Sequence, residues 1–422
     1  MLYSLALYLI SPLFFCYLLL RGLRDHDYWL RWTERLGLSG PKVPAGGIVV
    51  HAVSVGEVNA AESLIRALLQ HYPGRPLTVT CFTPTGSKRI KALFGPAVAH
   101  CYLPLDLPGA VKRFLRRIRP DLLVIMETEI WPNLYAACDR KGIPMLLANA
   151  RISDGSLSSY RKFHRLTAQT LGRLSRVGAQ SAEDARRLLE LGSRPDRTMV
   201  SGNLKFDISL APDLINQGRA LRERWGNERL VLLAASTRDG DETPVLQAFK
   251  ELLAEYPQAM LVVVPRHPER FFEVAGMIAA SSIPYAKLSQ PDADLTSVSC
   301  YLVDAMGQLL SFYAACDVAF VGGSLANTGG HNVLEAAVLA KPVLVGPNTF
   351  NFADITRQLV AHGGAMRVEN ATSLRAAVSA LFIDQEKRQE MGLAGQAWAA
   401  GGQGALSRTL GLVEECLDHS SS

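Results

Sequence analysis

Residues 322–347, GGSLANTGGHNVLEAAVLAKPVLVGP, are the stretch of sequence that decides the fold. An apolar strand is expected just before it and a second apolar strand near its end, with a loop of four glycines and a helix between them. Glycines let the backbone approach a ligand, and free N–H groups at a helix start attract phosphate. Asn332 and Glu335 are expected on this helix, where a carboxylate can hold a ribose. The stretch predicts a nucleotide site in a parallel sheet.

The glycine loop differs from two common phosphate-binding motifs. It has neither the G-x-x-x-x-G-K-[S/T] spacing of a Walker loop nor the G-x-G-x-x-G spacing of a dinucleotide turn. The pattern therefore favours a nucleotide-sugar transferase over an NTPase or a dehydrogenase.

Short apolar runs alternate with helical patterns on both sides of this stretch. Such alternation predicts parallel sheets with right-handed crossovers, and ligands bind beyond the C-terminal ends of the strands in such sheets. The polar segment 202–225 separates two series of strands. The expected strands are 48–53, 77–82, 122–126, 145–148, 177–180 and 198–201, then 230–235, 260–264, 300–303, 318–321 and 343–345. We therefore predict an α/β protein with two Rossmann-like domains that face each other across a cleft.

The N-terminus predicts a membrane anchor. Residues 2–20 contain no charge, which is enough to cross a bilayer as a helix, and Arg21, Arg24, Arg31 and Arg35 follow. The positive-inside rule then puts the rest of the chain in the cytoplasm. A partly inserted interfacial helix and a cleaved signal peptide are the alternatives. The predicted domains are an anchor at 1–22, an acceptor domain at 23–210 and a donor domain at 211–422, whose last helices pack back on the first domain.

Composition is that of a folded protein. The 422 residues are 48% hydrophobic and 20% charged, with a net charge of +5 that fits an anionic membrane or substrate. The seven cysteines are scattered, which suits reduced thiols in a cytosolic compartment, and no Cys/His cluster predicts a zinc site. The basic segment 112–119 has no accompanying aromatic pattern, so a nucleic-acid partner is not expected.

A carboxylate follows the first expected strand. Glu57 lies at the carboxyl end of this strand, just before a helix expected to start near Val58 or Asn59. A general base that deprotonates an acceptor hydroxyl would stand there. The alternative is a carboxylate that only complements the helix dipole.

Nine short motifs together resemble one known family. They are HAVSVGE (51–57), TPTGS (83–87), METEIWPN (126–133), ANARIS (148–153), GNLKFD (202–207), PRHPER (265–270), FVGGS (320–324), GGHNVLEAA (329–337) and GPNTFNF (346–352). With the N-terminal anchor they resemble, in order and over nearly the whole chain, the 3-deoxy-D-manno-octulosonic acid (Kdo) transferases of lipid A assembly.

The resemblance implies a GT-B fold and an inverting transfer of one or two Kdo units from CMP-Kdo to the lipid A precursor lipid IVA. It implies an enzyme at the cytoplasmic side of the bacterial inner membrane, with no cofactor. By position, Glu57 matches the catalytic base of the family. The residues that match its CMP-binding positions are Pro265, Arg266, Met306, Gly307, Gln308, Asn332, Val333, Leu334 and Glu335. Gln308 replaces a glutamate of some relatives, which makes a charged role there doubtful.

Further contacts to Kdo or the acceptor are expected from polar residues in these motifs. The Kdo carboxylate needs a cation, for which Lys205 and Arg266 are the candidates. Glu127 or Glu129 can accept sugar hydroxyls, or be held by backbone amides. His331 can point at phosphate, or bond within its loop. CMP-Kdo has no pyrophosphate for a metal to clamp, so we expect no metal. We expect Asp239-Gly240-Asp241 to serve helix capping and solvation.

Two other functions remain open from the residues. A GT-B transferase that uses a UDP-sugar would share the fold and the ribose-binding glutamate, but it leaves HAVSVGE unexplained. A non-catalytic membrane-tethered binding protein would keep its function when Glu57 is replaced.

Overall fold

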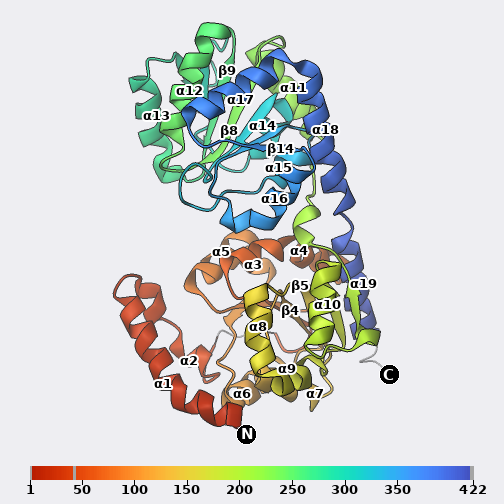
Figure 1. Cartoon of the computed structure of the whole chain (residues 1–422). Coiled ribbons are helices and arrows are strands. Elements are labelled where there is room, and N and C mark those ends of the chain that lie inside the picture. The colour runs from red at the N-terminus through yellow and green to blue at the C-terminus, as the bar shows by residue number, and fades with distance from the viewer. Residues whose placement is uncertain (1, 41–43, 419–422) are drawn as a thin grey trace. The chain divides into compact units, whose positions relative to one another are not determined.

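The chain divides into two units, each built around its own seven-stranded sheet (Figure 1). The computed structural model describes residues 2–40 and 44–418. Among these, unit 1 takes the residues up to Asp207 and from Gly402 onward, and unit 2 takes Ile208–Gly401. The sequence alone suggested a boundary at 210/211 and assigned the C-terminal helices to the second domain, packed back on the first. The outer ends of the predicted domains, at residue 1 and at 419–422, lie outside the described residues.

Unit 1 has a parallel sheet in the order β3-β2-β1-β4-β5-β6-β7. Its strands are β1 Ile48–His51, β2 Leu77–Cys81, β3 Ala99–Tyr102, β4 Leu122–Met126, β5 Met145–Ala150, β6 Arg176–Ala179 and β7 Thr198–Val200. The strand order reverses between β1 and β4, and ligands of doubly wound sheets bind at such a switch point.

Helices cover both faces of this sheet because successive side chains of a strand point to opposite faces. Val50 lies in the core under α4, α5 and α19, whereas its neighbour Val49 lies in the core under α6 and α7. The helices of unit 1 are α1 Leu2–Gly22, α2 Trp32–Arg35, α3 Val55–Ala60, α4 Glu62–His71, α5 Pro84–Phe94, α6 Pro108–Ile118, α7 Pro132–Asp139, α8 Asp154–Lys162, α9 His164–Leu171, α10 Ala182–Glu190 and α19 Ala405–Asp418.

Unit 2 has a parallel sheet in the order β10-β11-β9-β8-β12-β13-β14, which reverses between β8 and β12. Its strands are β8 Val231–Thr237, β9 Met260–Pro265, β10 Tyr285–Lys287, β11 Cys300–Leu302, β12 Val318–Val321, β13 Val343–Val345 and β14 Ala365–Arg367. Its helices are α11 Leu214–Trp225, α12 Glu242–Glu255, α13 Phe271–Ala280, α14 Leu309–Ala315, α15 Leu334–Ala337, α16 Ala353–Ala361, α17 Ala371–Ile383 and α18 Gln385–Gly401.

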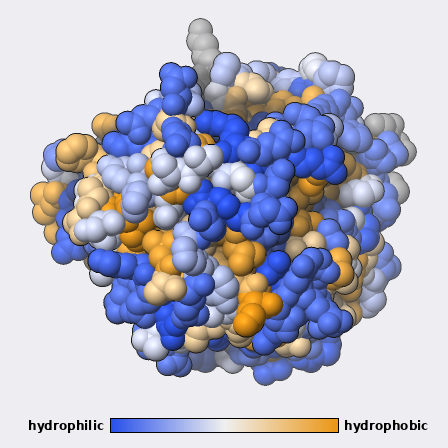
Figure 2. Space-filling model, turned by 90° about the horizontal axis from the view of Figure 1, so that it is seen from above, coloured by the Kyte–Doolittle hydropathy of each residue, from blue (hydrophilic) through white to orange (hydrophobic). Residues whose placement is uncertain are grey.

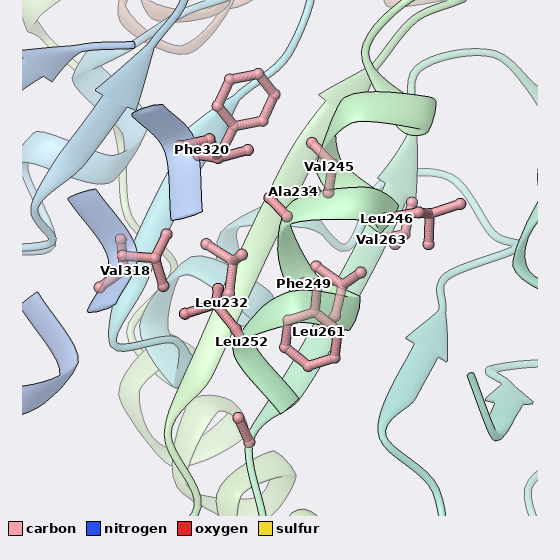
Figure 3. Packing of buried hydrophobic residues seen from close by; sticks show 14 of the residues in the cluster. Leu232, Ala234, Val245, Leu246, Phe249, Leu252, Leu261, Val263, Val318 and Phe320 are labelled. Carbon is pink, nitrogen blue, oxygen red and sulfur yellow. The ribbon is translucent and has the colours of Figure 1, made fainter. Parts of the chain in front are cut away.

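The core of unit 2 packs α12 against the sheet. Phe249 and Leu252 of this helix lie over Leu232 and Leu261 of the neighbouring strands β8 and β9 (Figure 3). On the other face Trp225 stacks with Phe312, with ring centroids 6.1 Å apart. The outer surface seen in Figure 2 is mostly hydrophilic, and hydrophobic side chains form separate areas between the hydrophilic ones.

The two predicted series of central strands are confirmed, and three edge or near-edge strands were missed. These are β3, β10 and β14, which are short and only partly buried. A strand that is half exposed lacks the continuous apolar run by which a central parallel strand is recognised.

Helix α1 is long and apolar enough to cross a membrane, by length and composition. One side of it contacts unit 1, because Tyr3 donates to Asp106 over 2.9 Å and the Phe14 ring lies 5.7 Å from that of Phe82. The opposite side exposes large apolar residues that include Leu5, Leu9, Leu13 and Leu20. All seven cysteines are free, and Cys16 in α1 is exposed while the other six are buried.

Candidate functional site

The candidate base lies at the switch point of the unit 1 sheet. Glu57 follows β1, and Glu127 and Glu129 follow the neighbouring strand β4. Because parallel strands end at the same edge of a sheet, these three carboxylates lie close together. Their charges act on one another, since both Glu127 and Glu129 raise the pKa of Glu57.

Glu57 lies in the first turn of α3. The helix begins at Val55, three or four residues before the expected start, because Ser54 caps it and accepts a hydrogen bond from the Glu57 N–H. The carboxylate reaches back and accepts from the Val53 N–H over 2.7 Å and from the Ser54 hydroxyl over 3.3 Å. Unlike in a capping box, the carboxylate accepts from the N–H of the residue before the N-cap, and this bond also stabilises the helix start. Stabilising the helix start and acting as a base are therefore compatible roles for this carboxylate, because its hydrogen bonds hold it in one position.

Burial makes Glu57 a stronger base than an exposed carboxylate. Burial raises the pKa of Glu57 to about 8, and the negative charges of Glu129 and Glu127 add to the rise, while the Val53 N–H opposes it. A general base works best when its pKa lies near the working pH. The neighbouring His51 is fully buried and its pKa falls to about 3, so it stays neutral and is a poor alternative base.

The segment after β4 holds two carboxylates in different ways. Glu127 has a left-handed backbone with φ 56°, which is strained for a residue other than glycine. Strain of this kind is found at functional sites more than elsewhere. Glu129 accepts a hydrogen bond from the Trp131 indole over 3.0 Å, and burial raises the pKa of its carboxyl. The side chain of Glu129 is thus oriented by Trp131.

Lys205 approaches this carboxylate group from another loop of unit 1. Burial lowers the pKa of Lys205, and Glu127 opposes the shift, so the two charges lie near each other. The Lys205 segment is held by Asn149, whose side-chain oxygen accepts from the Leu204 N–H over 3.0 Å. Asn149 is itself fully buried with φ 54° at an irregularity in β5.

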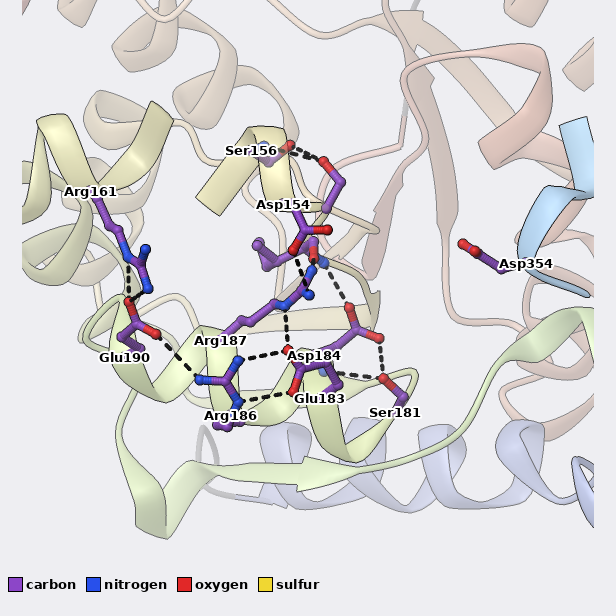
Figure 4. A network of polar contacts seen from close by, with 12 residues as sticks. Asp154, Ser156, Arg161, Ser181, Glu183, Asp184, Arg186, Arg187, Glu190 and Asp354 are labelled. Carbon is purple, nitrogen blue, oxygen red and sulfur yellow. Dashed lines mark hydrogen bonds and ion pairs between the residues drawn. The ribbon is translucent and has the colours of Figure 1, made fainter. Parts of the chain in front are cut away.

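A polar network fixes the loop between β5 and α8 (Figure 4). Arg187 of α10 donates to the Ile152 carbonyl over 2.6 Å and forms an ion pair with Asp154. Asp184 accepts from the Ile152 N–H over 2.9 Å. These bonds fix the backbone of Ile152, the residue that follows Arg151 in this loop. The charge of Arg151 lowers the pKa of Lys205.

The expected CMP-binding residues lie at one edge of the unit 2 sheet. Pro265 and Arg266 follow β9, and Met306, Gly307 and Gln308 follow β11, its neighbour. The Arg266 N–H donates to the Thr237 carbonyl over 3.0 Å, which ties the end of β9 to the end of β8. Gly307 has φ 87°, a conformation that favours glycine.

The glycine loop after β12 contributes the remaining expected donor residues, although its helix is shorter than the sequence suggests. α15 is a single turn, Leu334–Ala337, and Asn332 precedes it, so phosphate binding by a helix N-terminus is not supported. The Asn332 amide donates to the Glu335 carboxylate over 3.2 Å, and burial raises the pKa of Glu335. Val333 and Leu334 are buried, which leaves their backbone as the part that a ligand could contact.

Asp241 does not cap α12 as the sequence suggests. It makes no side-chain cap bond and instead accepts from the N–H groups of Gly323, Leu325 and Ala326 at 2.5, 3.2 and 2.9 Å. It also accepts from the Arg238 N–H over 2.9 Å. One buried carboxylate thus holds the start of the glycine loop, while Asp239 is exposed.

Four cationic or imidazole groups gather beside this loop. Burial lowers the pKa of His331 to about 4, and the charges of Arg266, Arg238 and His267 lower it further. His331 was expected from the sequence, whereas Arg238 and His267 were missed. Their position in the sequence could have identified them. Arg238 directly follows the central strand β8, and His267 is the second residue after β9.

The structure therefore groups the predicted residues by unit. Glu57, Glu127, Glu129 and Lys205 lie together in unit 1, and the predicted CMP-binding residues and His331 lie in unit 2. Over the stretches 2–40 and 44–418, no cluster of three or more His, Cys, Asp or Glu side chains could hold a metal ion.

Comparisons with known proteins point in one direction. A family model described as 3-deoxy-D-manno-octulosonic-acid transferase (kdotransferase) matches residues 30–208. A 3-deoxy-D-manno-octulosonic acid transferase of Haemophilus influenzae is 39% identical over 99% of this chain and 98% of its own length. The enzyme of the same name from Bordetella pertussis is 38% identical over 98% of this chain and 99% of its own length.

Solved structures of low sequence identity share the fold. UDP-GlcNAc 2-epimerase from Neisseria meningitidis, bound to UDP-GlcNAc, aligns with a TM-score of 0.57 at 15% identity, over 88% of this chain and 100% of that one. A glycosyltransferase from Rickettsia africae aligns with a TM-score of 0.54 at 15% identity, over 88% of this chain and 98% of that one. The predicted GT-B fold is thereby confirmed.

Proposed function

This chain belongs to the Kdo transferase family and is a glycosyltransferase of lipopolysaccharide biosynthesis, and from that premise we propose that it transfers Kdo from CMP-Kdo to lipid IVA. The observation that carries the proposal is the 39% identity to a Kdo transferase over the full length of both chains. The transfer inverts the anomeric centre, and one or two Kdo units are added.

Glu57 is the general base of this proposal. Its carboxylate takes the proton of the acceptor hydroxyl, the hydroxyl oxygen forms the new bond to the anomeric carbon, and the bond from that carbon to the CMP phosphate breaks. Two observations support this role. The raised pKa of about 8 makes the carboxylate a stronger base, and the hydrogen bonds from the Val53 N–H and the Ser54 hydroxyl hold it in a defined position.

In this proposal the donor nucleotide binds at the edge of the unit 2 sheet where its strands end. The Asn332–Glu335 pair offers a carboxylate for the ribose hydroxyls, and Arg266 offers a charge for the phosphate that leaves. Arg266 lowers the pKa of Glu335, so the two side chains are close enough to serve one nucleotide. Pro265, and the backbone of 306–308 and 332–334, complete the cradle.

Glu127, Glu129 and Lys205 serve the sugar and acceptor side. Lys205 and Glu127 lie near each other in unit 1, and the Trp131 indole orients Glu129. A carboxylate that is held in this way can accept hydrogen bonds from sugar hydroxyls with little loss of side-chain entropy. The neighbouring negative charges also keep Glu57 basic.

Helix α1 is the membrane anchor, with both units at the cytoplasmic side of the inner membrane. Its length, its apolar composition and the arginines that follow it support this orientation. The hydrogen bond from Tyr3 to Asp106 forms only while α1 lies along unit 1, so a helix that spans the bilayer releases it.

The test is transfer from CMP-Kdo to lipid IVA by the full chain in detergent, comparing wild type with Glu57→Ala. Glu62→Ala is the matched control, because Glu62 lies nearby on α4 and is ion-paired with Arg66 at the surface. We expect wild-type and control activity, with a loss of about 10²-fold or more for Glu57→Ala.

Other outcomes identify the alternatives. Full activity of Glu57→Ala would keep the enzyme class and move the base to Glu127 or Glu129. Inhibition by UDP instead of CMP, with turnover of a UDP-sugar, would refute the donor. Binding of lipid without any transfer would indicate a membrane-tethered binding protein.

A further inference from the structure

Three neighbouring strands of the unit 2 sheet end in positively charged or imidazole side chains. The strands β9, β8 and β12 lie side by side in parallel. Arg238 follows β8, Arg266 and His267 follow β9, and His331 lies in the glycine loop after β12. All four lie at the edge of the sheet where ligands of such folds bind.

Apart from the 3.8 Å contact between His267 and the largely exposed Glu269, the described residues form no ion pair with these groups. One buried nitrogen in each of three of them lacks a hydrogen-bond partner within the described chain, namely Nε of Arg238, Nε2 of His267 and Nε2 of His331. Buried polar nitrogens are seldom left unpaired unless a ligand or water satisfies them. Three such nitrogens from three adjacent loops therefore indicate a shared bound group.

Three carboxylates of the same region are already engaged. Asp241 accepts four backbone N–H bonds, Glu242 pairs with Arg270 over 3.1 Å, and Glu335 accepts from Asn332. Glu269 lies 3.8 Å from His267 but is largely exposed. Within the cluster itself Arg238 and Arg266 carry positive charge and no carboxylate is a member, which suits an anion.

The proposed donor has two anionic groups next to each other. In CMP-Kdo the phosphate and the carboxylate are both attached to the anomeric carbon. Arg266 lowers the pKa of Glu335, so it lies on the nucleotide side, whereas Arg238 and His267 act together with Arg266 on His331. The cluster thus extends beyond the position of the phosphate.

We propose that Arg238, His267 and His331 form a subsite for the carboxylate of the donor sugar, beside the phosphate contact of Arg266. The inference rests on the proposed function, because it assumes a CMP-activated sugar acid as donor. The guanidinium of Arg238 matches a carboxylate with two parallel N–H bonds, and the imidazoles add single N–H donors. The subsite would select sugars with a carboxylate at the anomeric carbon against neutral sugars.

The test compares a ligand with the carboxylate to one without it. The full chain in detergent is used to measure kcat/KM for CMP-Kdo and, by calorimetry, the Kd of CMP, for wild type and Arg238→Met. The backbone bond from Arg238 to Asp241 is retained in the variant. Arg357→Met is the control, because Arg357 is an exposed arginine of the same unit.

We expect kcat/KM for CMP-Kdo to fall about 10- to 100-fold in Arg238→Met, while the Kd of CMP stays within about twofold. Arg238→Lys should lose less kcat/KM than Arg238→Met, because lysine keeps the positive charge but lacks the paired N–H donors of a guanidinium. His267→Asn, a change of a partly exposed ring, should show the same selective loss even if Arg238→Met does not fold.

Two results would overturn the subsite. An equal loss for CMP and CMP-Kdo would mean that Arg238 binds the phosphate, and no loss for either would mean that it touches no part of the donor. Failure of wild type to bind CMP at all would refute the proposed donor instead, so the two failures are distinguishable.

Discussion

Replacing Glu57 by glutamine should abolish transfer and, at the same time, make folding less sensitive to alkaline pH. Glutamine keeps the shape of the protonated acid, and its side-chain oxygen can still accept from the Val53 N–H. It cannot ionise, so it removes both the base and the buried charge. The loss of transfer tests the role of Glu57 as base, and the smaller pH dependence of stability tests the raised pKa of its buried carboxyl.

The magnitude follows from the pKa of about 8 against an ordinary value of 4.5. A carboxyl with a raised folded-state pKa binds more protons in the folded than in the unfolded chain between these two values, so stability falls as the pH rises through that window. From pH 6 to pH 8 the loss is about 2 kcal/mol for one such group. The same pKa predicts that wild-type kcat/KM rises about tenfold per pH unit below pH 8 and levels off above it.

The assay is urea unfolding at pH 6 and at pH 8, followed by circular dichroism in detergent, for wild type, Glu57→Gln and the control Glu62→Gln. We expect wild type and control to lose about 2 kcal/mol more than Glu57→Gln between the two pH values. A parallel loss in all three proteins would mean that Glu57 is ionised in the folded state at neutral pH. That result, or a wild-type pH–rate profile that is flat from pH 6 to pH 8, would refute the raised pKa of the base.

Further changes test three other parts of the molecule. Asp241→Asn places N–H groups against the amides of the glycine loop, so the Kd of CMP measured by calorimetry should rise about 10-fold, and an unchanged Kd would contradict the loop-holding role. Gly322→Ala brings a methyl group within 2.7 Å of a backbone oxygen at the end of β8 and should destabilise unit 2 by about 1–3 kcal/mol in thermal unfolding, whereas Gly276→Ala meets open space and should not. Removal of Leu2–Gly22 should move the protein from the membrane to the soluble fraction, and Ser4→Cys in the full chain should react with a membrane-impermeant maleimide from the periplasmic side only if α1 spans the bilayer.

Local pattern was enough for the central architecture. The apolar runs of β8, β9 and β12 are buried on both faces of their sheet, so they stand out in the sequence as continuous stretches. The glycine loop, the carboxylate after the first strand and the order of nine motifs identified the class of enzyme before any distance was known. Each of these features involves residues that are neighbours in the chain.

Features made by residues far apart in the chain could be decided only by the tertiary structure. Asp241 reads as a helix cap, but its carboxylate accepts from amides 82 to 85 residues away. The raised pKa of Glu57 comes from burial and from charges that follow another strand. Arg238, His267 and His331 come to one edge of the sheet because β8, β9 and β12 are adjacent. The sequence by itself determined the central strands and the class of chemistry they serve, because those depend on local periodicity and motif. The electrostatics of the site depend on distances through space, and only the packed sheet sets those.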